Sequence, residues 1–312
     1  LLRVATCGTT GMSIAHCAYF HVASGLFDLV LAVGWEKMYQ NDPQGVMATV
    51  AEPFFLRPFL AGAPGAIALQ SREYIWRCPV PPQRVREAAA RISLRNHQAA
   101  LKNPYAHIQV DISVSDVLNS RVICDPLRLL DCCPSSDGAC ALLFASERKA
   151  KEMHPNPAWV VGLGYAGDEY FVGDKGLADW ESAKEAARQA YKMAGVRDPL
   201  KDLDLAEVYN PFTFQEMLFY ECFGFCPTGH AYEMIESGIT EPQGEFPISP
   251  SGGVLCTNPI GATGLIRVGE AALQVMGQAG ERQVPKRVEK ALAHAWGGSI
   301  QFNGVMILSR TL

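Results

Sequence analysis

The chain has 312 residues, 48% of them apolar, which is enough to bury a large core in one large or two ordinary domains. Its 27 basic and 32 acidic residues give a formal net charge of −5, so no strong positive field exists to hold nucleic acid. No apolar run approaches the ~20 residues of a membrane helix, and we therefore expect neither nucleic-acid binding nor a membrane span.

The cysteine content indicates a reducing compartment. Ten cysteines are scattered through apolar contexts in a chain too large for a disulfide-stapled mini-domain, so we expect free, mostly buried thiols and a cytoplasmic protein. Cys222, Cys226 and His230 follow at four-residue intervals, but glycine and proline between them interrupt a helix, and we expect no metal site. Because the chain begins at Leu1 inside an apolar run, we expect its N-terminus to be incomplete.

The first half begins with strand, turn, helix and strand. The apolar residues 1–6 lead into a small-residue turn, Cys7-Gly8-Thr9-Thr10-Gly11, and we predict a helix over 12–24 and a strand over 27–34. This order indicates a βαβ unit with a buried parallel sheet. This alternation of strands and helices then stops at a stretch rich in Pro, Phe and Gly. We therefore predict an insertion at about 40–120 that packs over the sheet and contains a helix at about 82–102. A strand at 139–145 closes the first half.

The second half repeats this plan. Its turn Gly261-Ala262-Thr263-Gly264 has the pattern of Gly8-Thr9-Thr10-Gly11 and again precedes a helix-like run. The repeat predicts an internally duplicated α/β core, with halves at 1–148 and 149–312. The other elements that we predict are strands at 159–164, 203–208 and within 291–308, and helices at 179–194, 212–223 and 262–279.

A glycine motif of the dinucleotide-binding type follows the strand at 159–164. Gly162, Gly164 and Gly167 match G-x-G-x-x-G, which raises a nicotinamide-dependent dehydrogenase as an alternative. However, a dinucleotide site needs a helix that begins at the third glycine, whereas the next helix is predicted only at about residue 179. We therefore interpret these glycines as part of a strand exit.

Cys7 has the position of a nucleophile. A cysteine where a strand meets a helix lies beside free backbone N–H groups and the positive end of the helix dipole, both of which favour the thiolate. We therefore expect Cys7 to ionise readily near neutral pH. Glu36 and Asp137 end strand-like motifs, and we expect their carboxylates to accept hydrogen bonds from the backbone rather than to take part in chemistry.

Five ordered motifs together resemble the thiolase superfamily, and within it the sterol-carrier-protein-type or lipid-transfer thiolases. They are Cys7-Gly8-Thr9-Thr10-Gly11-Met12, Gly34-Trp35-Glu36-Lys37-Met38, Cys133-Pro134-Ser135-Ser136-Asp137-Gly138-Ala139, Ser249-Pro250-Ser251-Gly252-Gly253 and Asn258-Pro259-Ile260-Gly261-Ala262-Thr263-Gly264. The resemblance covers essentially the whole chain. It implies a duplicated fold of two βαβαβ-type halves in a five-layered α-β-α-β-α arrangement with an inserted loop domain, and a dimer.

The resemblance also assigns roles. Cys7 matches the cysteine that an acyl-coenzyme A acylates, and His294, in His294-Ala295-Trp296-Gly297-Gly298, becomes the expected general base and acid. Asn258 stands where the family has the histidine of Gly-His-Pro, and we expect an oxyanion-hole amide there or a turn residue. Tyr209 replaces the usual Asn or His and is either a packed aromatic or a proton donor. The expected oxyanion and substrate-binding positions are Gly297, Gly298, Asn210, Gly252 and Gly253.

These roles predict an acyl-CoA C-acyltransferase that cleaves a 3-ketoacyl-CoA, or runs the reverse Claisen condensation, through an acyl-Cys7 intermediate in fatty acid or sterol metabolism. Two alternatives remain open: a tyrosine-dependent retro-aldolase on a hydroxyacyl-CoA, and a non-catalytic acyl-CoA or lipid binder. We expect coenzyme A as a substrate and no other cofactor, and as partners a second copy and a small zinc-ribbon and OB-fold protein. We also expect aromatic residues of the insertion to wall the acyl pocket, namely Phe54, Phe55, Phe59, Tyr74 and Trp76.

Overall fold

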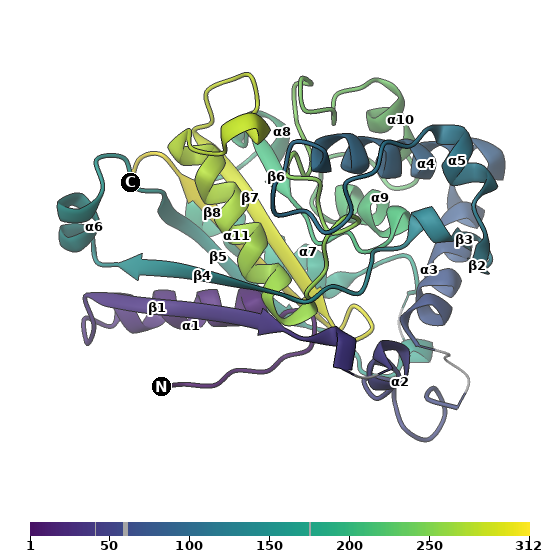
Figure 1. The fold of residues 1–312 in the computed structure, drawn as a ribbon, viewed down its shortest axis with the longest axis horizontal. Coiled ribbons are helices and arrows are strands. Elements are labelled where there is room, and N and C mark those ends of the chain that lie inside the picture. The colour runs from purple at the N-terminus through teal and green to yellow at the C-terminus, as the bar shows by residue number, and fades with distance from the viewer. Residues whose placement is uncertain (41, 59–61, 175) are drawn as a thin grey trace.

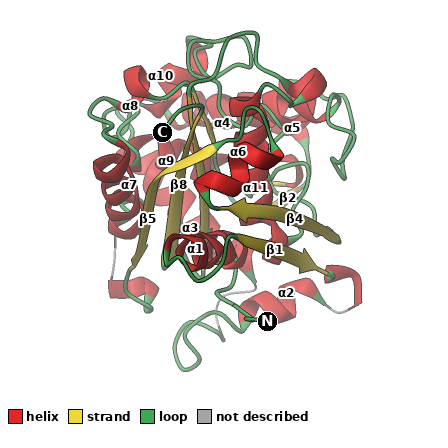
Figure 2. Ribbon diagram, turned by 90° about the vertical axis from the view of Figure 1, so that its left-hand side faces the viewer, coloured by secondary structure: helices red, strands yellow, loops and turns green. Residues whose placement is uncertain are grey.

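The core is a pair of helices between two sheets. The computed structural model describes residues 1–40, 42–58, 62–174 and 176–312 (Figure 1). Helices α1 (Thr10–Ala23) and α11 (Ile260–Met276) contact each other and both sheets (Figure 2). Alanine and glycine at their buried positions let the helices approach closely. The predicted α/β class is confirmed, but the second predicted turn is not a turn, because Gly261-Ala262-Thr263-Gly264 lies in the first part of α11.

One sheet contains only strands of the first half. Strands β1 (Leu29–Glu36) and β4 (Gly138–Ala145) pair antiparallel, with Leu29 opposite Ala145 and Glu36 opposite Gly138. The prediction of a parallel sheet here is wrong. The predicted strand at 1–6 is also absent, because these residues make a single bridge, between Thr6 and Gly8, and Leu1 and Leu2 are exposed.

The other sheet contains the strands of the second half in the order β5-β8-β7-β6. Its β6–β7 pair is parallel and the other two pairs are antiparallel. Helix α7 (Glu181–Ala194) packs against β5 and β8. The bounds of the strands are Trp159–Gly167 for β5, Leu205–Glu207 for β6, Lys290–Gly297 for β7 and Phe302–Ser309 for β8.

The layers number four over the described residues, where five were predicted. Helix α7, the second sheet, the α1–α11 pair and the β1–β4 sheet follow one another, and no helix of the described chain packs along the outer face of β1 and β4. Four alternate side chains of β1 are therefore exposed there, those of Leu29, Leu31, Val33 and Trp35.

The insertion between β1 and β4 is mostly helical and lies at one end of the molecule beside α9 (Thr213–Cys222) and α10 (Ala231–Glu236) (Figure 1). The helix predicted at 82–102 is confirmed as α4. The elements of the insertion are η1 (Met38–Gln40), α2 (Pro43–Ala48), α3 (Ala63–Arg77), α4 (Pro82–Ala100), α5 (Val114–Asn119), β2 (Val122–Cys124), β3 (Leu127–Arg128) and η2 (Leu129–Asp131). The short elements elsewhere are α6 (Glu147–Met153), η3 (Val172–Asp174), α8 (Pro199–Asp202) and η4 (Gly280–Arg282). Within the described ranges, no helix combines the length and the apolar character that crossing a bilayer requires.

The glycine motif of β5 serves helix–sheet packing. A Cβ atom at Gly162 would lie 2.6 Å from the carbonyl oxygen of Ala190, and one at Gly164 would overlap the carbonyl oxygen of Ala186, both in α7. The motif lies within β5, and no helix begins at Gly167. The interpretation as a strand motif rather than a dinucleotide turn is confirmed.

His294 is part of the hydrophobic core between β7 and α9. Its ring centroid lies 4.3 Å from that of Phe219 and 4.9 Å from that of Phe223. Its Nε2 is 3.0 Å from the amide oxygen of Asn303, and its Nδ1 accepts a hydrogen bond from the backbone N–H of Tyr209 at 3.4 Å. Burial lowers the pKa of His294 to about 3, so the folded protein holds this imidazole neutral.

The packing role of the glycine motif predicts unequal effects of the same substitution. Gly164→Ala places a methyl group on the α7 backbone and should lower the free energy of unfolding by about 3 kcal/mol. Gly167→Ala is the matched control, because the atoms nearest to its added Cβ lie at 3.7 Å, an ordinary contact. Urea denaturation of both variants measures the difference. Equal stability of the two variants would contradict this interpretation.

The burial of His294 predicts a loss of stability in acid. The unfolded chain binds a proton at His294 below its ordinary pKa of about 6.5, whereas the folded chain does not until about pH 3. Stability is thus complete above pH 6.5 and is lost as the pH falls toward 3, by about 2 kcal/mol between pH 7 and pH 5. His294→Gln should remove this part of the pH dependence in denaturation experiments, and the exposed His230→Gln should keep it.

Candidate active site

A cavity of about 530 Å³ opens where the turn before α1 meets the end of β7 and the turn before α11. Five predicted site residues line it: Cys7, Tyr209, Asn258, Gly297 and Gly298. Glu36, Cys132, Cys133 and Trp296 line it as well. None of these four was predicted as a site residue, although Glu36, Cys133 and Trp296 lie in motifs that the sequence already singles out.

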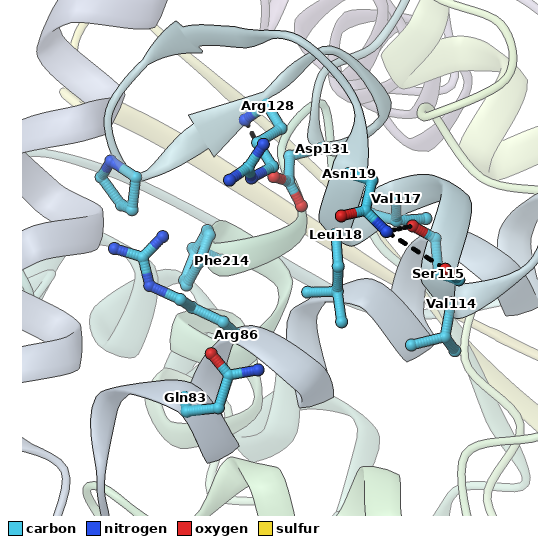
Figure 3. A pocket seen from close by; sticks show the side chains of 11 residues that line it. Gln83, Arg86, Val114, Ser115, Val117, Leu118, Asn119, Arg128, Asp131 and Phe214 are labelled. Carbon is cyan, nitrogen blue, oxygen red and sulfur yellow. Dashed lines mark hydrogen bonds between the residues drawn. The ribbon is translucent and has the colours of Figure 1, made fainter.

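A second cavity, of about 540 Å³, lies on the other side of the segment that contains β2 and β3 (Figure 3). Leu129 and Cys132 of this segment face the first cavity, whereas Arg128 and Asp131 line the second. Figure 3 shows Arg86 and Arg128 near Phe214 there. Because none of the predicted site residues lines this second cavity, the first cavity is the candidate active site.

Cys7 has a strained backbone that the turn around it holds in place. Its φ of 52° lies in the left-handed region, which costs a residue with a side chain about 1–2 kcal/mol. Thr10, the first residue of α1, donates to the Cys7 carbonyl oxygen from its N–H at 3.0 Å and from its hydroxyl at 2.7 Å. The Thr10 hydroxyl also accepts from the N–H of Thr6 at 2.9 Å. Such strain is typical of functional positions.

The thiol of Cys7 is less acidic than the sequence predicts. The residue is exposed toward the cavity, yet the protein atoms around its sulfur withdraw it partly from water and raise its pKa above the ordinary value. A hydrogen bond from the Gly298 backbone amide opposes this effect without overcoming it. Ready ionisation near neutral pH was therefore the wrong expectation, and Cys7 needs a base to become a thiolate.

Gly297 and Gly298 lie directly against the Cys7 turn. A Cβ atom on Gly297 would lie 2.7 Å from the backbone nitrogen of Thr9 and 2.9 Å from that of Gly8, so only glycine fits. A Cβ atom on Gly8 would in turn overlap the Trp296 carbonyl oxygen. This mutual approach brings the backbone amides of the β7–β8 connection beside the sulfur, where they can donate to an oxyanion.

Asn258 is oriented by a set of side-chain hydrogen bonds. Its amide oxygen accepts from the hydroxyl of Tyr209 at 3.1 Å and from that of Thr263 at 3.0 Å. Its Nδ2 donates to the sulfur of Cys133 at 3.1 Å. Because a carboxamide nitrogen carries two N–H groups, one remains for a substrate oxygen. Burial raises the pKa of Tyr209 and brings that of Cys133 to about 11, so both side chains are protonated at neutral pH.

His294 is apart from these residues. It does not line the cavity, its two ring nitrogens bond Asn303 and the Tyr209 backbone, and its pKa is depressed. The geometry therefore does not support its predicted role as general base. His294 instead holds the backbone that carries the Tyr209 side chain.

Asn210, Gly252 and Gly253 also lie away from the cavity lining. The Asn210 side chain donates to Glu216 and Asn96 and accepts from the N–H of Val254 at 2.8 Å. Gly252 and Gly253 have φ of 94° and 60° and pack against Ala100, Asn96 and Asn210. These contacts fix the backbone behind the site, which does not support a direct role in substrate binding.

Small aliphatic residues of the insertion wall the cavity in place of the predicted aromatics. Phe54, Phe55 and Trp76 are exposed, Tyr74 is fully buried elsewhere, and Phe59 lies outside the described residues. The aliphatic residues of the wall are Val46, Met47, Val50, Ile67, Ile123 and Leu129. The general expectation that the insertion covers the site thus holds, with a different set of side chains.

Comparisons with known proteins agree with this arrangement. The family model "Thiolase C-terminal domain-like" matches residues 168–310. An acetyl-CoA acetyltransferase of Methanothermobacter thermautotrophicus is 33% identical over 309 residues, which cover 98% of this chain and 79% of the relative. Sterol carrier protein 2 of Bos taurus is 32% identical over 311 residues, which cover 93% of this chain and 55% of that protein.

Solved structures agree on the fold. A structure titled "Ltp2-ChsH2(DUF35) aldolase" superposes with a TM-score of 0.83 at 24% identity, over 98% of this chain and 79% of that one. A monomeric SCP2-thiolase-like protein type 1 from Mycobacterium smegmatis superposes with a TM-score of 0.75 at 19% identity, over 99% of this chain and 62% of that one. The chain therefore has the thiolase fold and belongs to the thiolase superfamily.

Proposed function

We propose that this protein is a thiolase-type acyl-CoA C-acyltransferase in which Cys7 carries the acyl group. The observation that supports this most is the position of the Cys7 sulfur: just before α1, bonded by the Gly298 backbone amide, in a cavity that Gly297 and Asn258 also line. A nucleophile next to several oxyanion donors is what attack on a thioester or ketone requires. The relation to an acetyl-CoA acetyltransferase supports the same reaction class.

In the thiolytic direction, the Cys7 thiolate attacks the ketone carbon of a 3-ketoacyl-CoA. The resulting alkoxide is held by the amides near Gly298 and by the free N–H of Asn258. Its collapse breaks the carbon–carbon bond and releases an acyl-CoA as its enolate, which takes a proton. The thiolate of coenzyme A then attacks the acyl-Cys7 thioester and regenerates the enzyme. The aliphatic cavity wall favours an apolar acyl chain.

Acylation of Cys7 is the first test. Incubation with a 3-ketoacyl-CoA or a simple acyl-CoA should add one acyl group to the protein, and peptide mass spectrometry should locate it on Cys7. Cys7→Ala should abolish the adduct. Cys133→Ala is the matched control. The thiol of Cys133 lines the same cavity as Cys7 but accepts a hydrogen bond from Asn258, and we expect it to remain unlabelled. Tight binding of the thioester without adduct or turnover would point to a non-catalytic binder.

A second candidate is retro-aldol cleavage of a hydroxyacyl-CoA, and the position of Tyr209 favours it. The tyrosine hydroxyl lies in the cavity, is held by Asn258, and stays protonated, so it can give its proton to the carbon of the departing enolate and, as a phenolate, take up the proton of the substrate hydroxyl. An aldolase structure, "Ltp2-ChsH2(DUF35) aldolase", has the same fold and is 24% identical to this chain, which supports this second candidate. Retro-aldol cleavage would not require an acylated Cys7.

The variant Tyr209→Phe distinguishes the two reactions. If thiolysis is the activity, loss of the hydroxyl should change the rate of Cys7 acylation by less than about tenfold, because it only loosens Asn258. If retro-aldol cleavage is the activity, the same variant should lose about 10²-fold or more in cleavage rate. The measurement is turnover of matched 3-ketoacyl-CoA and 3-hydroxyacyl-CoA substrates. Retro-aldol turnover that survives Cys7→Ala would reject the thiolase proposal.

We also propose that the protein works in an assembly in the cytoplasm. The "Ltp2-ChsH2(DUF35)" title names two components, which supports a partner such as a zinc-ribbon and OB-fold protein. The exposed apolar face of β1 supports contact with a second copy, although one solved neighbour is described as monomeric. All ten cysteines are free, which supports a reducing compartment.

A further inference from the structure

The proposed acyl transfer needs a proton acceptor for Cys7, and the residues expected to supply one do not. His294 lies outside the cavity with both nitrogens bonded, and Asn258 carries a neutral amide. An amide cannot hold the proton of a thiol. We propose that Glu36 is the general base and acid of this site; this inference rests on the proposed function.

Elimination among the cavity residues leads to Glu36. Of the described residues that line the cavity, the titratable side chains are Cys7, Glu36, Cys132, Cys133 and Tyr209. Burial raises the pKa of Cys132, Cys133 and Tyr209, so these three are protonated at neutral pH and cannot accept a further proton. Glu36 is the only carboxylate in that lining, and no histidine, lysine or arginine of the described lining accompanies it.

The fold holds the Glu36 carboxylate at the start of α11. Glu36 is the last residue of β1, and its Oε2 accepts a hydrogen bond from the N–H of Gly261 at 3.2 Å. The carboxylate lies close because Gly261 has no Cβ, which would lie 3.1 Å from Oε2 and 2.9 Å from the Trp35 carbonyl oxygen. The N-terminus of a 17-residue helix stabilises a negative charge at this position.

Backbone N–H groups bond both oxygens of the Glu36 carboxylate, as the sequence predicts, but they do not use all of its acceptor positions. Its Oε1 accepts only from the adjacent Lys37 N–H, at 3.3 Å, among the hydrogen bonds of the described residues. A carboxylate has about four acceptor positions, so positions remain for a proton. Glu36 is half-buried and Cys7 is exposed toward the same cavity, so the two groups share one solvent-filled space.

Glu36 alone can carry every proton that the reaction moves. Glu36 takes the proton of the Cys7 thiol, and the thiolate attacks the ketone carbon. When the carbon–carbon bond breaks, the α-carbon of the leaving enolate takes that proton, and Glu36 is ionised again. In the second half, Glu36 takes the proton of coenzyme A, whose thiolate attacks the acyl-Cys7 thioester. The departing Cys7 sulfur recovers this proton, so neither an oxidant nor a metal is required.

The test is Glu36→Gln, whose amide oxygen can still accept from Gly261. At pH 7 its rate of Cys7 acylation should fall about 10²-fold, the usual size of a general-base contribution. The loss should shrink as the pH rises toward the raised pKa of Cys7, because the thiol then ionises unaided. Alkylation of Cys7 by iodoacetamide should show the same pH dependence. A purely structural defect would leave a constant loss at every pH.

Two further variants complete the design. Asp137→Asn is the matched control, because Asp137 also ends a motif, accepts from the Tyr39 N–H at 3.0 Å and does not line the cavity, and it should acylate like the wild type. Glu36→Asp should recover part of the rate. Wild-type acylation kinetics and pH profile in Glu36→Gln would overturn the inference while leaving the proposed function intact. Failure of the wild-type enzyme itself to acylate Cys7 would reject the proposed function instead.

Discussion

The site depends on backbone touching backbone at the starts of helices α1 and α11. A Cβ atom on Gly11 would overlap the backbone nitrogen of Leu265, and one on Gly264 would lie 2.5 Å from that of Met12. The starts of α1 and α11 can therefore cross at a distance that no larger residue allows. This crossing brings Cys7, just before α1, and Asn258, just before α11, to a single cavity. Glu36, the last residue of β1, joins them there because it accepts a hydrogen bond from Gly261 of α11.

Buried ion pairs hold the segment that carries Tyr209 to helices α11 and α4. Glu207 pairs with Arg267 of α11 and accepts from the Ser251 hydroxyl at 2.8 Å, while Glu216 pairs with Arg95 of α4. Both pairs are almost fully buried, so replacing one partner would leave an uncompensated charge in the core. Here the two pairs tie α4 of the insertion and α11 of the second half to the elements on either side of Tyr209.

The sequence predicts the local pattern of this fold well and its long-range geometry less well. The first turn, both central helices and the strands of the second half follow from periodicity and from glycine, because these signals are local. The antiparallel pairing of β1 and β4 depends on which strands meet in space. His294 shows the same limit: its motif predicts a catalytic imidazole, whereas its burial against Phe219 and Phe223 is visible only in three dimensions. The backbone bond of Glu36 follows from its motif, whereas its place in the cavity lining is visible only in three dimensions.

The left-handed backbone of Cys7 lowers the stability of the fold at the position that we propose for the reactive sulfur. Glycine would adopt a φ of 52° at no steric cost, so replacing the cysteine by glycine relieves strain at the start of α1. Random mutation at this codon is thus not opposed by the folding of the chain. Under the proposed acyl transfer, the sulfur at this position is kept for its reactivity, at a cost of about 1–2 kcal/mol in the folding free energy.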